Sequence, residues 1–261
     1  MDVFEENREN RGKPGTDGTF SDILLLMASL ARVIAVNLPH HVTQRGNALQ
    51  FLFVSDGERN VYLDLLRRYI ELYRLSLLGY CLMSNHVHLV VVPCAADSLG
   101  LALKHTHGRY ASFWNAAHGS SGHVWQGRFY SCPLDNSHLW IALRYTELNP
   151  VRAGLVSDAK SWTWSSARAH CGCGEADVCL DTEKFSRRWS TEGWQEYLAT
   201  GESEAELAAI RRCTHTGRPL GTPQFIQSLE QTIHRDLAAK KGGRPASSMC
   251  AQDQKILTFD K

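Results

Sequence analysis

Two apolar runs separated by only two residues constrain the fold of this 261-residue chain more than any other feature of its sequence. The runs are Leu75–Met83 and His86–Val92, and Ser84-Asn85 lies between them. Proline follows the second run and ends it. Apolar runs of this length with so short a connection are typical of adjacent strands in one sheet. The sequence therefore predicts a sheet in which these two runs are neighbours.

Helical and extended patterns alternate around this pair of strands. Three segments show the three- and four-residue apolar steps of an amphipathic helix, namely Asp56–Tyr73, Ser98–His118 and Ser137–Leu148. Two further strands are expected, one within Val33–Thr43 and one at Trp125–Ser131. The order β-α-β-β-α-β-α predicts an α+β fold: a ferredoxin-like antiparallel sheet with helices on one face, followed by a mostly helical C-terminal extension.

The distribution of charge divides the chain into four parts. Residues 1–30 are polar and acidic, and we expect them to be a disordered extension. Residues 31–170 carry 13 basic and 8 acidic side chains and form the predicted domain. Residues 171–210 carry 3 basic and 9 acidic side chains and are expected to be an acidic linker, whereas 211–261 are a basic helical extension and tail. Basic regions are typical of phosphate contact, although an ordinary solvated surface explains them equally well.

Two classes of protein are disfavoured by the composition. No run of about 18 apolar residues is present, so no membrane span is predicted, and residues 1–22 lack the basic start of a signal peptide. We therefore expect a cytoplasmic protein with no membrane partner. Eight cysteines form no pair of CxxC motifs; His170 with Cys171, Cys173 and Cys179 is a weak alternative zinc site, because its spacing matches no standard one.

The pair His86 and His88 is the strongest local signal for chemistry. Residues two apart in a strand face the same side, so both imidazoles are able to bind one metal ion. His105 and His107 have the same spacing in a helical pattern, where they point in directions about 200° apart. The adjacent His40-His41 face opposite sides of a strand. Only the first pair combines the spacing with the context that chelation needs.

Tyr145 and Asn149 are four residues apart and share a face of the predicted helix. A phenol can attack phosphorus and form a covalent phosphotyrosine, which divides one difficult transfer into two steps. The Asn149 amide oxygen is a candidate third ligand beside the two histidines. Such a mixed nitrogen and oxygen set suits Mg²⁺ or Mn²⁺. Taken alone, Tyr145 fits a packing role better, and the partnership with Asn149 favours the catalytic one.

The segment Trp125–Phe129 places aromatic side chains around Arg128. Aromatic and basic side chains in this arrangement can stack unpaired bases and hold a nucleic-acid backbone. A strand with core aromatic residues explains the pattern equally well.

Taken together, these segments resemble the REP-associated tyrosine transposases, a branch of the transposase family named after insertion sequence 200. Five motifs in order, spread over about residues 31–170, carry the resemblance: Pro39–Asn47, Tyr80–Val90, Gly122–Phe129, Arg144–Val156 and Trp164-Ser165-Ser166. Ser84 departs from the pattern, because relatives often have proline there. The C-terminal part from Thr216 to Pro245 also resembles extensions of some relatives, with less specific motifs.

The resemblance implies a nuclease core of the HUH type, a metal-dependent single-tyrosine endonuclease and strand transferase. It implies that His86, His88 and Asn149 bind the metal and that Tyr145 is the nucleophile. The product would be a 5′-phosphotyrosine intermediate with a free 3′-hydroxyl. The partner would be single-stranded DNA in which palindromic repeats fold into hairpins, bound by a monomer or homodimer. We expect DNA contacts from ten residues: Arg45, Asn47, Trp125, Arg128, Arg144, Arg152, Arg218, Lys240, Lys241 and Arg244.

Two alternatives stay open from the sequence. The chain is either an active strand transferase or a domesticated relative that binds repeat hairpins without turnover. Tyr110, beside Arg109, is a rival nucleophile, but Trp114 stands four residues on where an oxygen ligand is needed. We therefore expect Tyr145 to be the nucleophile.

Overall fold

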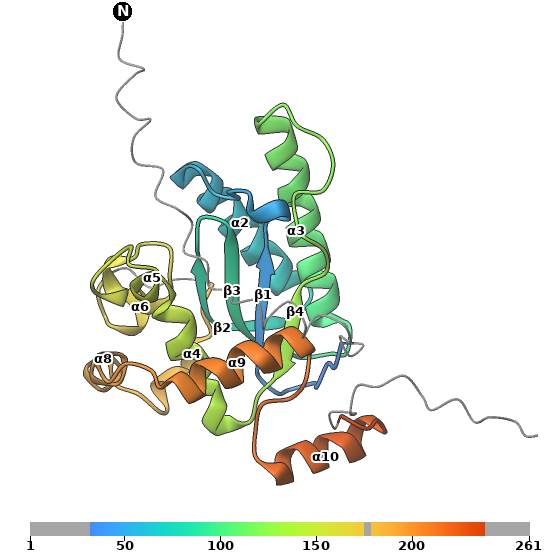
Figure 1. Ribbon diagram of the computed structural model, residues 1–261, viewed down its shortest axis with the longest axis vertical. Coiled ribbons are helices and arrows are strands. Elements are labelled where there is room, and N and C mark those ends of the chain that lie inside the picture. Colours follow the sequence, from blue (N-terminus) through green and yellow to red (C-terminus); the bar gives the residue numbers. More distant parts are fainter. Residues whose placement is uncertain (1–31, 175–178, 238–261) are drawn as a thin grey trace, which may run out of the picture.

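The computed structural model describes residues 32–174 and 179–237, and Figure 1 shows a sheet with helices around it. All neighbouring strands are antiparallel, in the order β2-β3-β1-β4. Their bounds are β1 His40–Arg45, β2 Leu75–Leu82, β3 His86–Pro93 and β4 Tyr130–Pro133. One helix follows β1 and one follows β3, so the chain order is βαββαβ. The predicted ferredoxin-like sheet is confirmed, with β2 and β3 as neighbours.

Helices α2 (Asp56–Leu72) and α3 (Ser98–Ala117) cover one face of the sheet. Alternation along β3 sends Val87 and Leu89 into the core beneath these helices, and His86 and His88 lie on the other face. Burial of the apolar side chains is the main force that docks the two helices. Because side chains alternate along β3, one face of the strand packs in the core and the other carries the histidines.

The opposite face is covered by helix α4 (Asn136–Glu147), so the expectation of helices on one face holds only for the two crossover helices. Leu78 and Val90 point to this face and need apolar cover, which Leu143 of α4 supplies. Gly79 permits the close approach, since a Cβ there would lie 2.2 Å from Leu143 Cδ1. The helix that carries Tyr145 is thus pressed against the sheet.

The C-terminal half consists of short helices that continue to pack on the domain. Their bounds are α5 Asn149–Arg152, α6 Ala167–His170, α7 Thr182–Ser186, α8 Thr191–Ala199, α9 Glu204–Thr216 and α10 Pro223–Ile233. Two 3-10 turns complete the described elements, η2 Asn47–Leu49 and η3 Ala159–Ser161. Figure 1 shows α9 beside α4, across the end of the sheet near β4. No helix among the described residues has the length and apolarity needed to cross a bilayer.

The region 171–210, expected to be a linker with some helix, forms α7, α8 and part of α9 in its described residues. Trp194 of α8 is fully buried, and its indole Nε1 donates a hydrogen bond of 2.8 Å to Glu147 Oε2 at the end of α4. The boundary expected at 210/211 falls inside α9. The high content of acidic residues suggested a linker, because the region has only a few large apolar side chains to dock it on the domain. The extension expected over 1–30 lies outside the described residues.

Two strand predictions differ from the structure in extent. Residues 33–36 form no strand, although Val33 and Ala35 are buried against Leu229 of α10. The expected strand at 125–131 begins only at Tyr130, and Trp125 makes a single bridge to Gly46. In both cases the loop buries a β-branched or aromatic side chain, Val33 in one and Trp125 in the other. Residues of these types are also typical of strands, so the sequence pattern of such a loop resembles that of a strand.

Acid should destabilise this fold in part through His107, which is buried beside Trp125 and lies 3.1 Å from the Tyr62 hydroxyl. Burial lowers the pKa of His107 to about 3, whereas an unfolded histidine titrates near 6.5. The unfolded state therefore binds an extra proton below pH 6.5, and stability falls by about 1.4 kcal/mol per pH unit there. Urea denaturation at pH 7 and pH 5 should show a smaller loss in His107→Gln than in the wild type, by about 2 kcal/mol. Equal losses would contradict this account.

Candidate functional site

Three imidazoles gather on the face of the sheet that α4 covers. The rings of His86 and His88 on β3 have centroids 5.0 Å apart. His41 of the adjacent strand β1 stacks on His88, with centroids 5.2 Å apart and an interplanar angle of 11°. Both side chains lie on the same face of β3, and their rings are nearly perpendicular, with an interplanar angle of 81°. His41 is an addition that only the pairing of β1 with β3 reveals.

Hydrogen bonds fix the orientation of both β3 histidines. His86 Nδ1 lies 2.7 Å from Asn85 Oδ1, and because an amide oxygen only accepts, Nδ1 carries the proton. His88 Nδ1 lies 3.0 Å from His41 Nε2, whose other nitrogen lies 2.8 Å from the Thr214 hydroxyl oxygen. One set of tautomers that satisfies these contacts has each Nδ1–H donating away from the site. In that set Nε2 of His86 and of His88 carries the lone pair that a metal ligand requires.

All three imidazoles are held neutral. Burial lowers the pKa of His41 to about 3, with the charges of Arg152 and His215 acting in the same direction. Burial, then Arg45 and Arg152, lower the pKa of His86 to about 3, while a hydrogen bond with the Asn149 side chain opposes the shift. Burial also holds the pKa of His88 well below its ordinary value. Neutral imidazole is the form that binds a metal.

Tyr145 and Asn149 reach this cluster from the end of α4 and the start of α5. The Tyr145 ring meets His41 and His88 edge-on, with centroid distances of 5.5 and 5.6 Å. Asn149 lies against His86, as the hydrogen bond from its side chain requires. The structure thus brings together the four residues expected to form the centre. They come from β3 and the helix after β4, nearly 60 residues apart in sequence.

The rival nucleophile Tyr110 lies on the other side of the sheet. Its side chain is fully buried between α2 and α3, and its hydroxyl donates a hydrogen bond of 2.5 Å to the Leu52 carbonyl oxygen. Burial also raises the pKa of its phenol. Because the histidines face α4, Tyr110 cannot act with them.

The predicted DNA contacts near the sheet have different surroundings. Arg45, the last residue of β1, is exposed and lies opposite His86 in the strand register, and Asn47 is exposed in the turn that follows. Trp125 is only 8% exposed, and its indole packs on His107 and donates to the His107 carbonyl oxygen at 2.9 Å. Its surroundings are those of a core residue, not of an exposed base-stacking platform.

Arg128 is exposed and lines a pocket together with Arg32, Phe129 and Thr214. The Arg32 guanidinium lies 3.6 Å from the centroid of the Phe129 ring. Burial lowers the pKa of Arg32, and the charge of Arg128 adds to the effect. Two cations therefore share a pocket that adjoins Thr214, the partner of His41.

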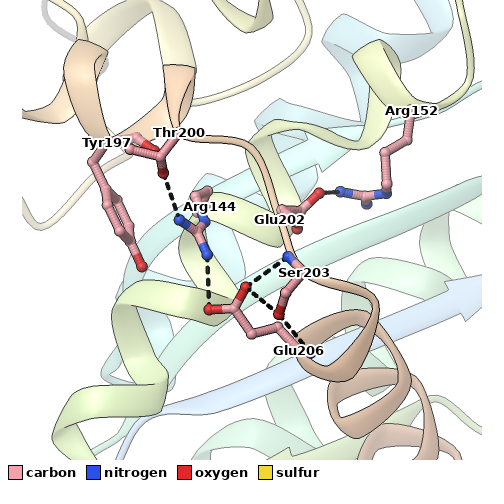
Figure 2. Close-up of polar contacts among 7 residues, drawn as sticks. All are labelled: Arg144, Arg152, Tyr197, Thr200, Glu202, Ser203 and Glu206. Carbon is pink, nitrogen blue, oxygen red and sulfur yellow. Dashed lines mark hydrogen bonds and ion pairs between the residues drawn. The ribbon is translucent and has the colours of Figure 1, made fainter.

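Arg144 and Arg152 are engaged by residues of the C-terminal half, as Figure 2 shows. Arg144 donates to Glu206 and to Thr200, both at 2.9 Å, and its side chain is 6% exposed. Arg152 is paired with Glu202, and it also donates to the Tyr145 carbonyl oxygen at 2.8 Å. Each guanidinium is already paired with a carboxylate, with which a phosphate would have to compete.

The expected contacts in the C-terminal part are mostly outside the described residues. Arg218 is half-buried and donates to the carbonyl oxygen of Leu237. Lys240, Lys241 and Arg244 lie beyond residue 237. The alternative zinc site has no support in 32–174 and 179–237, where no three His, Cys, Asp or Glu side chains gather as metal ligands. His170 instead pairs with the buried Glu147 carboxylate at 2.5 Å.

Sequence reasoning missed several residues that complete the site. His41 appeared only as a failed chelating pair with His40, because strand register cannot be read from sequence. Thr214 and Glu202 lie more than 50 residues after Tyr145, and no local pattern connects them to it. Only the regional charge gave a hint, since the acidic residues 171–210 follow a basic domain.

Comparisons with known proteins agree with the motifs. Residues 36–149 match the family model described as transposase IS200 like. A search of curated protein sequences finds no match. Two solved structures are similar at low identity. A REP-associated tyrosine transposase bound to a REP hairpin has 15% identity and a TM-score of 0.48, with 59% of this chain and 91% of that chain covered. A putative transposase from Deinococcus radiodurans R1 has 16% identity and a TM-score of 0.33, covering 42% and 88% respectively.

Proposed function

We propose that this chain, whose residues 36–149 match the model of the IS200-like transposase family, cleaves and rejoins single-stranded DNA through a covalent link to Tyr145. The observation that carries the proposal is the contact of the Tyr145 ring with His41 and His88, two of the three buried histidines that lie on one face of the sheet. The motif resemblance over about residues 31–170 supports the narrower substrate class, palindromic repeats folded into hairpins.

In the proposed reaction the Tyr145 phenolic oxygen attacks a backbone phosphorus. The new phosphorus–oxygen bond replaces the bond to the 3′-oxygen, so the product is a 5′-phosphotyrosine and a free 3′-hydroxyl. The phenol loses its proton and the departing 3′-oxygen gains one, so no net proton is released. Attack of a 3′-hydroxyl on the phosphotyrosine reverses the step and joins the strands. The covalent intermediate conserves the bond energy needed for rejoining.

The donor set supports a divalent metal at the two histidines. Nε2 of His86 and His88 and the Asn149 amide oxygen are the atoms that would hold it, and a hard or borderline ion such as Mg²⁺ or Mn²⁺ suits them. When bound, such an ion supplies charge that polarises the scissile phosphate. Asn85 and His41 would then act as the hydrogen-bond partners that keep the two imidazoles oriented.

The DNA backbone is proposed to approach along the exposed side of the site. Arg45 and Asn47 stand beside His86, and Arg128 with Arg32 forms the second group of exposed or half-exposed cations. Such groups gain affinity by releasing counterions from phosphates, so their effect on binding weakens as salt rises.

Thr214→Val tests the orientation of His88 by removing one hydroxyl from the chain of hydrogen bonds. Without that acceptor His41 is free to change tautomer and turn away from His88. We expect Mn²⁺ affinity to fall about 10- to 100-fold, the loss typical of a missing outer partner of a metal ligand. Isothermal titration with Mn²⁺ measures this, with Thr216→Val on the same helix as the control. An unchanged affinity would show that His41 does not orient the ligand.

The proposed function itself is tested by incubating the protein with labelled hairpin DNA and Mg²⁺ or Mn²⁺. A denaturing gel should show a covalent protein–DNA species and a released fragment with a free 3′-hydroxyl. A protein that binds the hairpin but gives no covalent species with either metal would be the non-catalytic binder instead.

A further inference from the structure

The two arginines that flank the tyrosine are both held by a short acidic segment far along the chain. Figure 2 shows Glu202 directed at Arg152 and Glu206 at Arg144, with Tyr197 and Thr200 on the far side of Arg144. Both glutamates come from the turn after α8 and the first turn of α9. The acidic segment thus pairs with two basic residues of the domain, one on α4 beside Tyr145 and one on α5.

Besides its ion pair with Glu202, Arg152 makes two direct contacts with Tyr145. The guanidinium lies 4.1 Å from the centroid of the Tyr145 ring and donates to the Tyr145 carbonyl oxygen at 2.8 Å. A cation over a ring face is attracted to it, and here it presses on the face of the phenol whose edge meets the histidines. The orientation of the phenol therefore depends on where Arg152 is held.

Glu202 is what holds Arg152. Its side chain is 5% exposed and that of Arg152 is 18% exposed, so water competes little with the pair. Glu206 is different, because its side chain is 29% exposed and its partner Arg144 lies 4.2 Å over the Tyr197 ring instead of the nucleophile. The chain therefore contains two similar ion pairs, of which only one touches the tyrosine.

We infer that Glu202 is a positioning residue of the reaction, which fixes the Tyr145 phenol toward the histidines by holding Arg152 against its ring. The inference rests on the proposed function of Tyr145. It also assigns the region 171–210 to the catalytic unit instead of to a linker, since this region supplies the residue that orients the nucleophile.

The test compares four glutamate variants of the full chain in single-turnover reactions with saturating hairpin DNA and Mn²⁺. Glu202→Gln keeps the shape of the side chain but removes its charge, and the rate of covalent-complex formation should fall by about 10- to 100-fold, as misplacement of a reacting group by about 1 Å does. The half-saturating DNA concentration should change less than about threefold, because the backbone contacts proposed above are Arg45, Asn47, Arg128 and Arg32. Arg152, which the sequence suggested as a DNA contact, is held against Tyr145 instead. Glu206→Gln should reduce the rate less than Glu202→Gln.

The matched control is Glu204→Gln in the same turn of α9, which is exposed and should behave as the wild type. A double-mutant cycle adds a readout that a general loss of stability would not produce. In an Arg152→Gln background, Glu202→Gln should have almost no further effect on the rate, since the group it positions is gone. Glu202→Asp, which keeps the charge, should restore part of the rate.

Hydrogen exchange measures the positioning without activity. Backbone amides of α5 should exchange faster in Glu202→Gln than in Glu204→Gln, while those of β3 stay unchanged. If the wild type forms no covalent complex, the proposed function fails. If the wild type reacts and Glu202→Gln reacts at the same rate, or loses DNA affinity and rate together, the positioning role is overturned while the proposed function stands.

Discussion

Tyr145→Phe should remove the covalent protein–DNA species completely while leaving the fold and hairpin binding intact. Phenylalanine keeps the ring that meets His41, His88 and Arg152, so the packing around α4 is retained. It lacks the oxygen that would attack phosphorus, and no other side chain of the site replaces it. Denaturing gels with labelled hairpin DNA and Mn²⁺ measure the covalent species, and gel shifts measure binding.

Tyr110→Phe is the matched control for this prediction. It removes a buried hydrogen bond to Leu52, which should cost about 1 kcal/mol of folding stability but leave covalent-complex formation unchanged. Loss of the covalent species in Tyr110→Phe and its survival in Tyr145→Phe would reverse the assignment of the nucleophile.

His86→Ala should abolish cleavage through loss of the metal. The variant lacks one of the two proposed imidazole ligands. Loss of an outer hydrogen-bond partner lowers metal affinity by up to about 100-fold, so loss of a ligand should lower Mn²⁺ affinity by more than that. His86 is preferable to His88 for this test because it is half-exposed at the start of β3, whereas His88 is buried against His41. Hairpin affinity should stay within about threefold, since the proposed phosphate contacts lie on Arg45, Arg128 and Arg32.

His105→Ala is the control for His86→Ala, because it belongs to the other pair with the same spacing. In α3 the ring of His105 stacks on Tyr69 and Tyr73 while His107 turns into the core. This variant should bind Mn²⁺ and react as the wild type does. Normal Mn²⁺ affinity in His86→Ala, or an unfolded protein, would make the two histidines structural.

The sequence predicted the parts of the fold that depend on local periodicity. The alternation in residues 86–92 placed two histidines on one face, and the three- and four-residue steps located α2, α3 and α4. The sheet order followed from the chain order of strands and helices, because few arrangements of βαββαβ are available. The same reasoning distinguished His86 and His88 from the pairs at 40–41 and 105–107, and the structure places both rings on one face of β3.

What the sequence could not predict depends on contacts between distant segments. The stacking of His41 on His88 requires the register of β1 against β3, and the hydrogen bond to Thr214 requires the docking of α9. Arg152 carries a charge that suggested DNA contact, and only the fold places Glu202 against it. Composition likewise suggested a linker at 171–210, although Trp194 buries this region against Glu147.

The most direct test of the central claim is to identify the amino acid that carries the DNA. The wild-type protein is allowed to react with hairpin DNA and Mn²⁺, digested with nuclease and protease, and analysed by tandem mass spectrometry. A peptide containing Arg144 and Glu147 should carry the mass of a 5′-phosphorylated nucleotide on Tyr145. An adduct on any other residue would contradict the proposed centre, as would the absence of an adduct under conditions in which the DNA is cut.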